Sequence, residues 1–169
     1  MLAASKSQVL VRLISLTILT AWFAALIPLH AESPESASRH RLEGAWWVTV
    51  TQYDCTSGVK RPSFSSILLF SRGGTVTEAT SNPGFLPGQR STGFGIWSES
   101  EHGTYSASDV AFILFTGGPF QLGSQKLTHT ITLDRDADSF TDEAKVQFYN
   151  ASGTLLMAGC ASATATRLQ

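Results

Sequence analysis

The chain has 169 residues, of which 43% are hydrophobic and 15% are charged, and its formal net charge is −1. This length is enough for one domain with a sizeable core. The charges are scattered and form no basic stripe, which excludes the usual pattern of a nucleic-acid-binding protein, so no nucleic-acid partner is expected.

Residues 1–31 have the pattern of a signal peptide. Lys6 and Arg12 form a basic start, residues 13–29 are an uncharged apolar run, and Ala31 is a small residue suited to cleavage. We therefore expect a secreted or periplasmic protein with no stable membrane insertion after cleavage. An uncleaved anchor is the alternative, because the run is close to the shortest length that spans a bilayer.

A polar segment rich in Ser, Pro and Glu, residues 32–41, is expected to be a flexible linker, and residues 42–169 a single domain. This domain contains eight strand-like runs bounded by turn residues. Short connections with glycine, such as Arg72-Gly73-Gly74 and Ala151-Ser152-Gly153, suit tight hairpins. The one long irregular loop spans residues 82–92. The expected strands span residues 45–54, 64–71, 75–81, 93–99, 104–115, 126–134, 140–149 and 155–168.

Consecutive strands joined by short turns form an up-and-down meander, which removes its exposed edges by closing. The expected fold is therefore all-β, an eight-stranded antiparallel up-and-down barrel whose first strand pairs with its last. A two-sheet sandwich with those strands unpaired is the alternative. A barrel of eight strands has an interior that side chains fill or that holds one small ligand.

The two cysteines, Cys55 and Cys160, are expected to form a disulfide, because each has only one partner available in an oxidising compartment. Two buried free thiols are the alternative. If the cysteines face each other across the first and last strands, Val48 lies opposite Arg167 and Val50 lies opposite Ala165. The disulfide would then join the two strands at the seam of the barrel.

Alternation along the strands predicts which side chains point into the lumen. Phe140, Asp142, Ala144, Val146 and Phe148 share one face of their run, and Leu127, His129, Ile131 and Leu133 share one face of theirs. Gly159 and the small residues Ala161, Ala163 and Ala165 share the inward face of the last run, which leaves room in the interior. The expected ligand-binding residues are His129, Leu133, Phe140, Phe148, Ala161 and Ala163.

The motif Gly44-x-Trp46 at the start of the first strand, together with Arg167 on the last strand, resembles the calycin superfamily and above all the lipocalins. The resemblance implies that Trp46 packs at the closed end of the barrel beneath Arg167, as a structural cation–π pair. The later lipocalin motifs are absent, and Gly95-Ile96-Trp97 is a second match to the short motif. The layout is also similar to barrels of the allene-oxide-cyclase type.

His129 is the best candidate for chemistry in the lumen, because it is a titratable ring on an apolar face. The alternative is a structural histidine in the core whose hydrogen bonds are made by a neighbouring group. Asp142 lies on the adjacent run, and a His129–Asp142 pair would orient the imidazole as a general base or bind a polar head group. Glu78, Arg90 and Tyr105 are further polar candidates.

No metal or cofactor is expected. Asp134-x-Asp136-x-Asp138 suggests calcium, but an EF-hand loop needs Gly where Ser139 stands and Glu where Lys145 stands. The segment fits a polar hairpin turn better. The sequence also contains no nucleophile elbow, phosphate loop or dinucleotide fingerprint.

The leading hypothesis is an exported lipocalin-like barrel that binds a small, largely apolar molecule in its lumen. The sequence favours such a carrier over an enzyme. One alternative is a cyclase or isomerase that uses His129 and Asp142. Another is a secreted protein-binding or inhibitor module that acts through residues 32–41 and the loop at residues 82–92.

Overall fold

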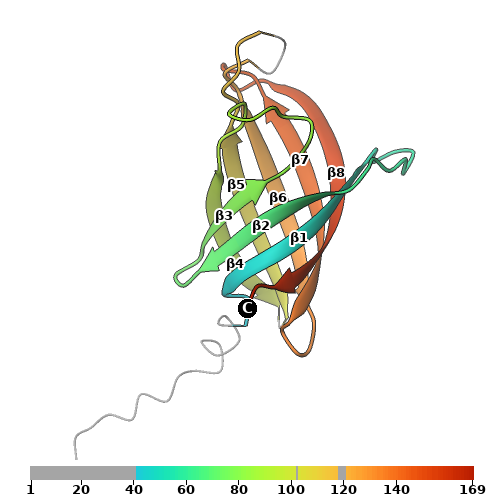
Figure 1. The fold of residues 1–169 in the computed structure, drawn as a ribbon, viewed down its shortest axis with the longest axis vertical. Coiled ribbons are helices and arrows are strands. Elements are labelled where there is room, and N and C mark those ends of the chain that lie inside the picture. Colours follow the sequence, from blue (N-terminus) through green and yellow to red (C-terminus); the bar gives the residue numbers. More distant parts are fainter. Residues whose placement is uncertain (1–40, 102, 118–120) are drawn as a thin grey trace, which may run out of the picture. The chain divides into compact units, whose positions relative to one another are not determined.

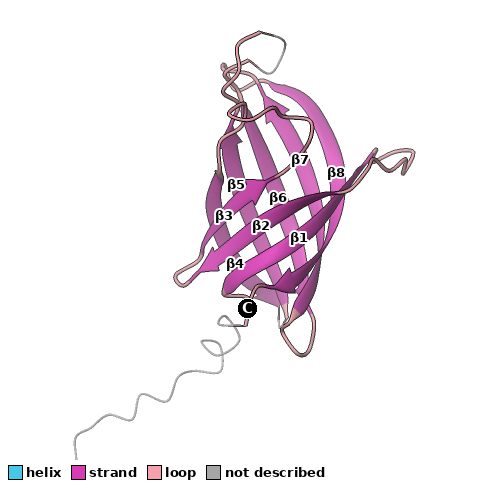
Figure 2. Cartoon of the chain, in the orientation of Figure 1, coloured by secondary structure: helices cyan, strands magenta, loops and turns pink. Residues whose placement is uncertain are grey.

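The structure, a computed structural model, describes residues 41–101, 103–117 and 121–169. The expected signal peptide and residues 32–40 of the expected linker lie outside this part of the chain. Within it, all regular elements are strands (Figure 2). The described residues accordingly include no helix that is long and apolar enough to cross a membrane.

Eight strands form one closed antiparallel barrel in which each strand pairs with the next and the first pairs with the last, as predicted (Figure 1). The strands are β1 (Gly44–Tyr53), β2 (Phe64–Ser71), β3 (Thr75–Thr80), β4 (Gly93–Glu101), β5 (Thr104–Phe112), β6 (Ser124–Leu133), β7 (Ser139–Tyr149) and β8 (Leu155–Arg167).

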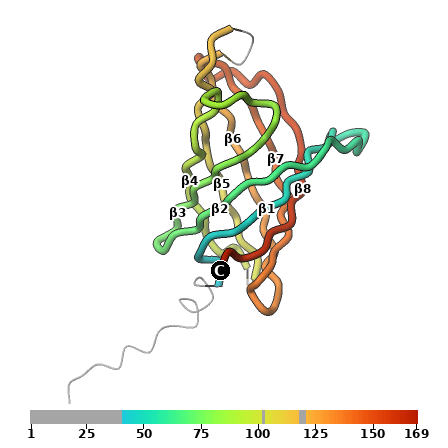
Figure 3. The backbone as a smooth tube through the Cα atoms, in the orientation of Figure 1, coloured from blue at the N-terminus to red at the C-terminus, as the bar shows by residue number. Residues whose placement is uncertain are grey.

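The two ends of the barrel differ in their connections. At one end, which we call the closed end, β1 begins, β8 ends, and the β2–β3, β4–β5 and β6–β7 connections are short. Gly73 and Gly74 make the β2–β3 turn at φ values of 93° and 90°, which residues with a side chain rarely adopt. The opposite, open end carries the longer β1–β2, β3–β4 and β5–β6 connections, as the path of the chain shows (Figure 3).

The seam between β1 and β8 differs from the expected register. Trp46, rather than Val48, lies opposite Arg167, and Cys160 lies opposite Tyr53. The prediction was therefore wrong by two residues. Because side chains alternate with a period of two, a shift of two residues leaves every side chain on its expected face.

The predicted disulfide between Cys55 and Cys160 is present, with the two Cα atoms 5.3 Å apart. Cys55 lies beyond the end of β1, in the turn that leads to β2. The register prediction failed because a disulfide requires only that two Cα atoms be close, a condition that a residue in a turn beside the ladder also meets.

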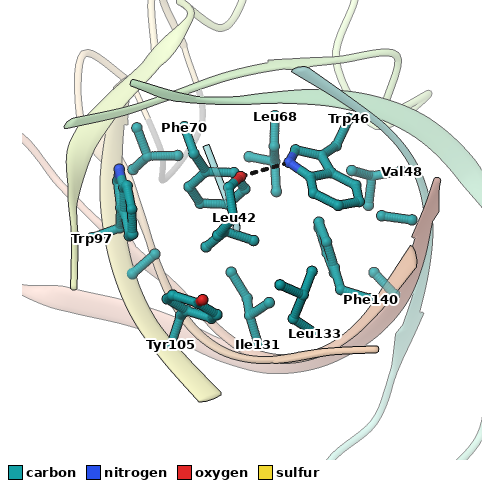
Figure 4. Close-up of a cluster of buried hydrophobic side chains, with 14 residues drawn as sticks. Leu42, Trp46, Val48, Leu68, Phe70, Trp97, Tyr105, Ile131, Leu133 and Phe140 are labelled. Atoms are coloured by element: carbon teal, nitrogen blue, oxygen red, sulfur yellow. Dashed lines mark hydrogen bonds between the residues drawn. The ribbon is translucent and has the colours of Figure 1, made fainter. Parts of the chain in front are cut away.

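Inward side chains fill the closed half of the barrel. The cluster of buried hydrophobic residues at the closed end, which we call the lower core, contains Trp46, Phe70, Trp97, Tyr105 and Phe140, among others. Figure 4 shows their rings arranged around Leu42. A second core nearer the open end consists of Ile113, Leu127, Ala144, Val146, Phe148 and Ala161, with Val50, Phe85 and Phe115 packed against it. The barrel interior also contains buried polar side chains, which with Arg90 we call the polar layer: Ser66, Glu78, Asp109, Gln125, His129 and Asp142.

Candidate functional site

The closed end is sealed by the pair that the sequence singled out. The Arg167 guanidinium lies 4.1 Å from the centroid of the Trp46 ring. The Trp46 indole donates a hydrogen bond to the Leu42 carbonyl at 2.9 Å (Figure 4). Arg167 also donates to the carbonyls of Ala137 at 2.9 Å and Glu43 at 2.6 Å. Arg167 thus joins the start of β1, the β6–β7 turn and the end of β8.

Two of the expected ligand-binding residues belong to this seal. Phe140 packs against Trp46 with the ring centroids 4.9 Å apart, and Leu133 lies in the same lower core. Neither residue lines the two cavities described below. Tyr105 is likewise fully buried in the lower core, with its ring 5.9 Å from that of Trp97. The closed half of the lumen is therefore filled by packed side chains.

Above the lower core, His129 on β6 lies between two carboxylates. Its Nδ1 is 2.7 Å from Asp142 Oδ2 on β7, and its Nε2 is 3.1 Å from Asp109 Oδ1 on β5. All three side chains are at least 94% buried. The structure thus brings together the His129–Asp142 pair considered from the sequence and adds a second carboxylate.

The two carboxylates decide the protonation state of His129. Burial alone would lower the pKa of His129, but the hydrogen bonds and charges of Asp109 and Asp142 raise it to about 10. At neutral pH the ring is therefore an imidazolium that donates one N–H to each carboxylate. Such a ring has no lone pair free to accept a proton, so this arrangement does not provide a general base.

A second ion pair continues the polar layer. Arg90, from the β3–β4 connection, donates to Glu78 on β3 and to Gln125 on β6. Burial raises the pKa of Glu78, and the charge of Arg90 opposes that rise. The layer depends on a missing side chain at Gly93, because a Cβ there would lie 2.4 Å from Asp109 Oδ2 and 3.3 Å from Glu78 Oε2.

A small cavity lies beside this polar layer, and we call it the lumen cavity. Its volume is about 30 Å³. Its walls include Ala144, Ala161 and Ala163, small residues whose size leaves the space, and the polar residues Ser66, Glu78, Arg90, Gln125, His129 and Asp142. A space of this size holds roughly two water-sized groups, not a whole ligand.

A larger pocket, the mouth pocket, opens at the open end and has a volume of about 530 Å³. Its apolar wall is formed by Phe85, Phe115, Val146, Phe148 and Met157, and the Phe85 and Phe148 rings are 6.3 Å apart. Its rim carries polar and charged side chains, including Gln52, Asp54, Arg61 and Gln89. Gln52, Asn82 and Val146 line both the mouth pocket and the lumen cavity, so the two spaces adjoin.

Sequence reasoning missed Asp109, Gln125 and the role of two loop phenylalanines. Asp109 shares the buried face of β5 with Tyr105, Ala107 and Ala111, so the alternation along this strand was a signal for an inward carboxylate. Phe115 was expected inside a strand, but β5 ends at Phe112 and Phe115 lies in the connection over the mouth. Nothing in the sequence indicated that Phe85 lines the pocket, because a loop sequence does not show which of its side chains pack against the barrel.

The Asp134–Asp138 segment forms the β6–β7 turn. The Asp134 carboxylate accepts hydrogen bonds from the Asp138 backbone N–H at 3.1 Å and from the Ser139 hydroxyl at 2.7 Å. These bonds give the carboxylate a structural role in the turn. Within the described ranges, no group of three His, Cys, Asp or Glu side chains is arranged to hold a metal ion.

Comparison with known proteins does not identify the chain. No protein-family model, no curated protein and no solved structure matches it.

Proposed function

We propose that this protein is an exported, calycin-like barrel that binds a small, largely apolar molecule in the mouth pocket. The mouth pocket itself is the observation that supports this proposal most strongly. Its volume of about 530 Å³ lies within the range of roughly 300–1,000 Å³ that is usual for small-molecule sites. An apolar wall with a polar rim suits a ligand whose body is hydrophobic.

The site differs from the one expected from the sequence, because it lies higher in the barrel. Phe148 and the small residue Ala161 remain near it, whereas Phe140 and Leu133 are part of the sealed end. The ligand enters from the open end, where the β1–β2, β3–β4 and β5–β6 connections surround the pocket.

Export is part of the proposal and has two supports. The sequence of residues 1–31 has the basic start and apolar run of a signal peptide. The Cys55–Cys160 disulfide is typical of proteins that fold in an oxidising compartment. Likeness to the calycins is supported by the closed eight-stranded barrel and by the Trp46–Arg167 pair at its sealed end.

The alternatives have weaker support. A cyclase or isomerase that uses His129 as a base would need a neutral imidazole. The pKa of His129 is instead raised to about 10, and each of its ring N–H groups donates a hydrogen bond to a carboxylate. A binding module acting through the β3–β4 loop would need that loop to present its side chains outward. Leu86 in this loop is exposed, but Phe85 packs towards Phe148 and the Arg90 side chain is buried against Glu78, so only part of the loop faces outward.

A blocking substitution tests the proposal. Gly159 lines the mouth pocket, and a Cβ on it would meet no other atom within 4 Å. Gly159→Leu should therefore fill the pocket without straining the fold. Binding of the neutral apolar fluorophore N-phenyl-1-naphthylamine should weaken by at least about tenfold, since a buried apolar contact area is lost.

Thr164→Leu is the matched control, because Thr164 is an exposed residue on the same strand and lines neither cavity. This variant should bind the fluorophore as the wild type does. Equal binding by Gly159→Leu and wild type would show that the mouth pocket is not the site.

A further inference from the structure

Two carboxylate oxygens of the polar layer, Asp109 Oδ2 and Asp142 Oδ1, are buried and accept no hydrogen bond from the described residues. Asp109 Oδ2 lies against Gly93, and Asp109 does not line the lumen cavity. Asp142 Oδ2 accepts a hydrogen bond from His129, whereas Asp142 Oδ1 has no such donor. The Asp142 side chain is only 3% exposed, and the residue lines the lumen cavity. A buried acceptor of this kind costs free energy until a donor reaches it.

The charges of the layer favour a donor that is a cation. Three carboxyl groups, Glu78, Asp109 and Asp142, stand against two cations, Arg90 and the His129 imidazolium. An anionic group would be repelled by Asp142 and would leave Oδ1 without a donor. An ammonium group suits this position, because it carries a positive charge and has N–H groups that can donate to Asp142 Oδ1.

The size of the two spaces indicates how such a ligand lies. The lumen cavity, at about 30 Å³, accepts a head group of one or two non-hydrogen atoms but no larger group. It adjoins the mouth pocket at Gln52, Asn82 and Val146, so a head at Asp142 continues into a body held by the apolar wall.

We propose that the ligand of this barrel is an amphiphile with a protonated primary amine at its inner end, and that Asp142 Oδ1 binds this ammonium. The inference rests on the proposed function, because the mouth pocket must hold the apolar body. It adds the chemical class of the ligand and a residue that determines specificity.

Competition against N-phenyl-1-naphthylamine at pH 7.5 tests the head group directly. Octylamine, octanol and octanoate each have an eight-carbon skeleton, and their head groups at this pH are cationic, neutral and anionic. For the wild type we expect octylamine to bind about tenfold more tightly than octanol, which reflects one charge-assisted hydrogen bond, and octanoate to bind most weakly.

Variants assign the preference to Asp142. Asp142→Asn should bring the affinity ratio of octylamine to octanol to within about twofold of unity, since the charge that selects the ammonium is gone. Glu143→Gln removes a carboxylate from the exposed face of the same strand and should keep the wild-type ratio. If thermal unfolding shows that Asp142→Asn is not folded, Ala163→Val replaces it. This change occupies the lumen cavity, keeps every charge, and should also remove the preference.

Two results would overturn the inference. The first is octanol binding as tightly as octylamine in the wild type. The second is an amine preference that persists in the folded Asp142→Asn or Ala163→Val variant, which would place the selecting charge at the rim, where Asp54 lies. Failure of the fluorophore itself to bind the wild type would instead contradict the proposed function, and this inference with it.

Discussion

Arg167 lies directly opposite Trp46 across the β1–β8 seam, with its guanidinium 4.1 Å from the centroid of the indole ring. The contact joins the first and last strands at the closed end, where Trp46 has no exposed surface. It makes the seam a part of the core rather than an edge, so the stability of the barrel should depend strongly on this one aromatic side chain.

Trp46→Ala should lower the free energy of unfolding by about 3–5 kcal/mol, as expected when a buried aromatic ring is removed from a core. Trp47 provides a matched control in the same strand, because it points outward and is 47% exposed. Trp47→Ala should change stability by no more than about 1 kcal/mol. Urea denaturation of both variants measures the difference, and equal effects would contradict the assignment of the closed end.

The disulfide should be a second major contributor to stability. Cys55 and Cys160 are separated by 105 residues, and closing a loop of this length stabilises the folded state by roughly 4–5 kcal/mol in the chain-entropy model. Reduction, or the double substitution of both cysteines by serine, should lower the unfolding midpoint accordingly. A midpoint that does not respond to reductant would show that the bond does not constrain the unfolded chain.

The sequence predicted the all-β closed barrel because alternation, glycine turns and strand count are local signals that all point to one topology. It predicted which faces point inward for the same reason, and a register error of two residues left those faces unchanged. The depth of each residue along the barrel axis was not predictable. Phe140 and His129 both point inward, yet one seals the closed end and the other lies in the polar layer. Depth depends on how loops and partner strands fill the interior, which no local pattern encodes.

His129 should remain protonated well above neutral pH. Its pKa is raised from 6.5 to about 10 in the folded state. Nitrogen-15 NMR of the imidazole at pH 8 should show both ring nitrogens carrying hydrogen. A neutral tautomer at this pH would contradict the bridged geometry with Asp109 and Asp142.

The same shift makes stability depend on pH. A group whose pKa is higher in the folded than in the unfolded state stabilises the fold fully below its unfolded pKa and loses that contribution as the pH rises. The contribution of His129 should therefore be complete below pH 6.5 and should decline towards pH 10. Urea midpoints at pH 6, 7.5 and 9 measure the decline. Stability that rises across this range would mean that the imidazolium is not stabilised by folding.

Gly93 tests the packing of the polar layer. Gly93→Ala would place a methyl group against Asp109 Oδ2 and Glu78 Oε2, so it should destabilise the protein by about 1–3 kcal/mol, as overpacked interiors do. Gly159→Ala is the control, because its added methyl group enters open space and should not lower stability. Thermal melting of both variants separates the two cases, and a neutral Gly93→Ala would show that the carboxylates are not held against β4.

Native mass spectrometry of the protein purified from its own source shows whether the barrel holds a small molecule at its open end. We expect a species heavier than the bare chain by the mass of one small molecule, which is released on gentle activation and is absent from Gly159→Leu expressed in the same source. A wild-type protein found only at the bare mass, which also fails to bind N-phenyl-1-naphthylamine, would contradict the proposed function.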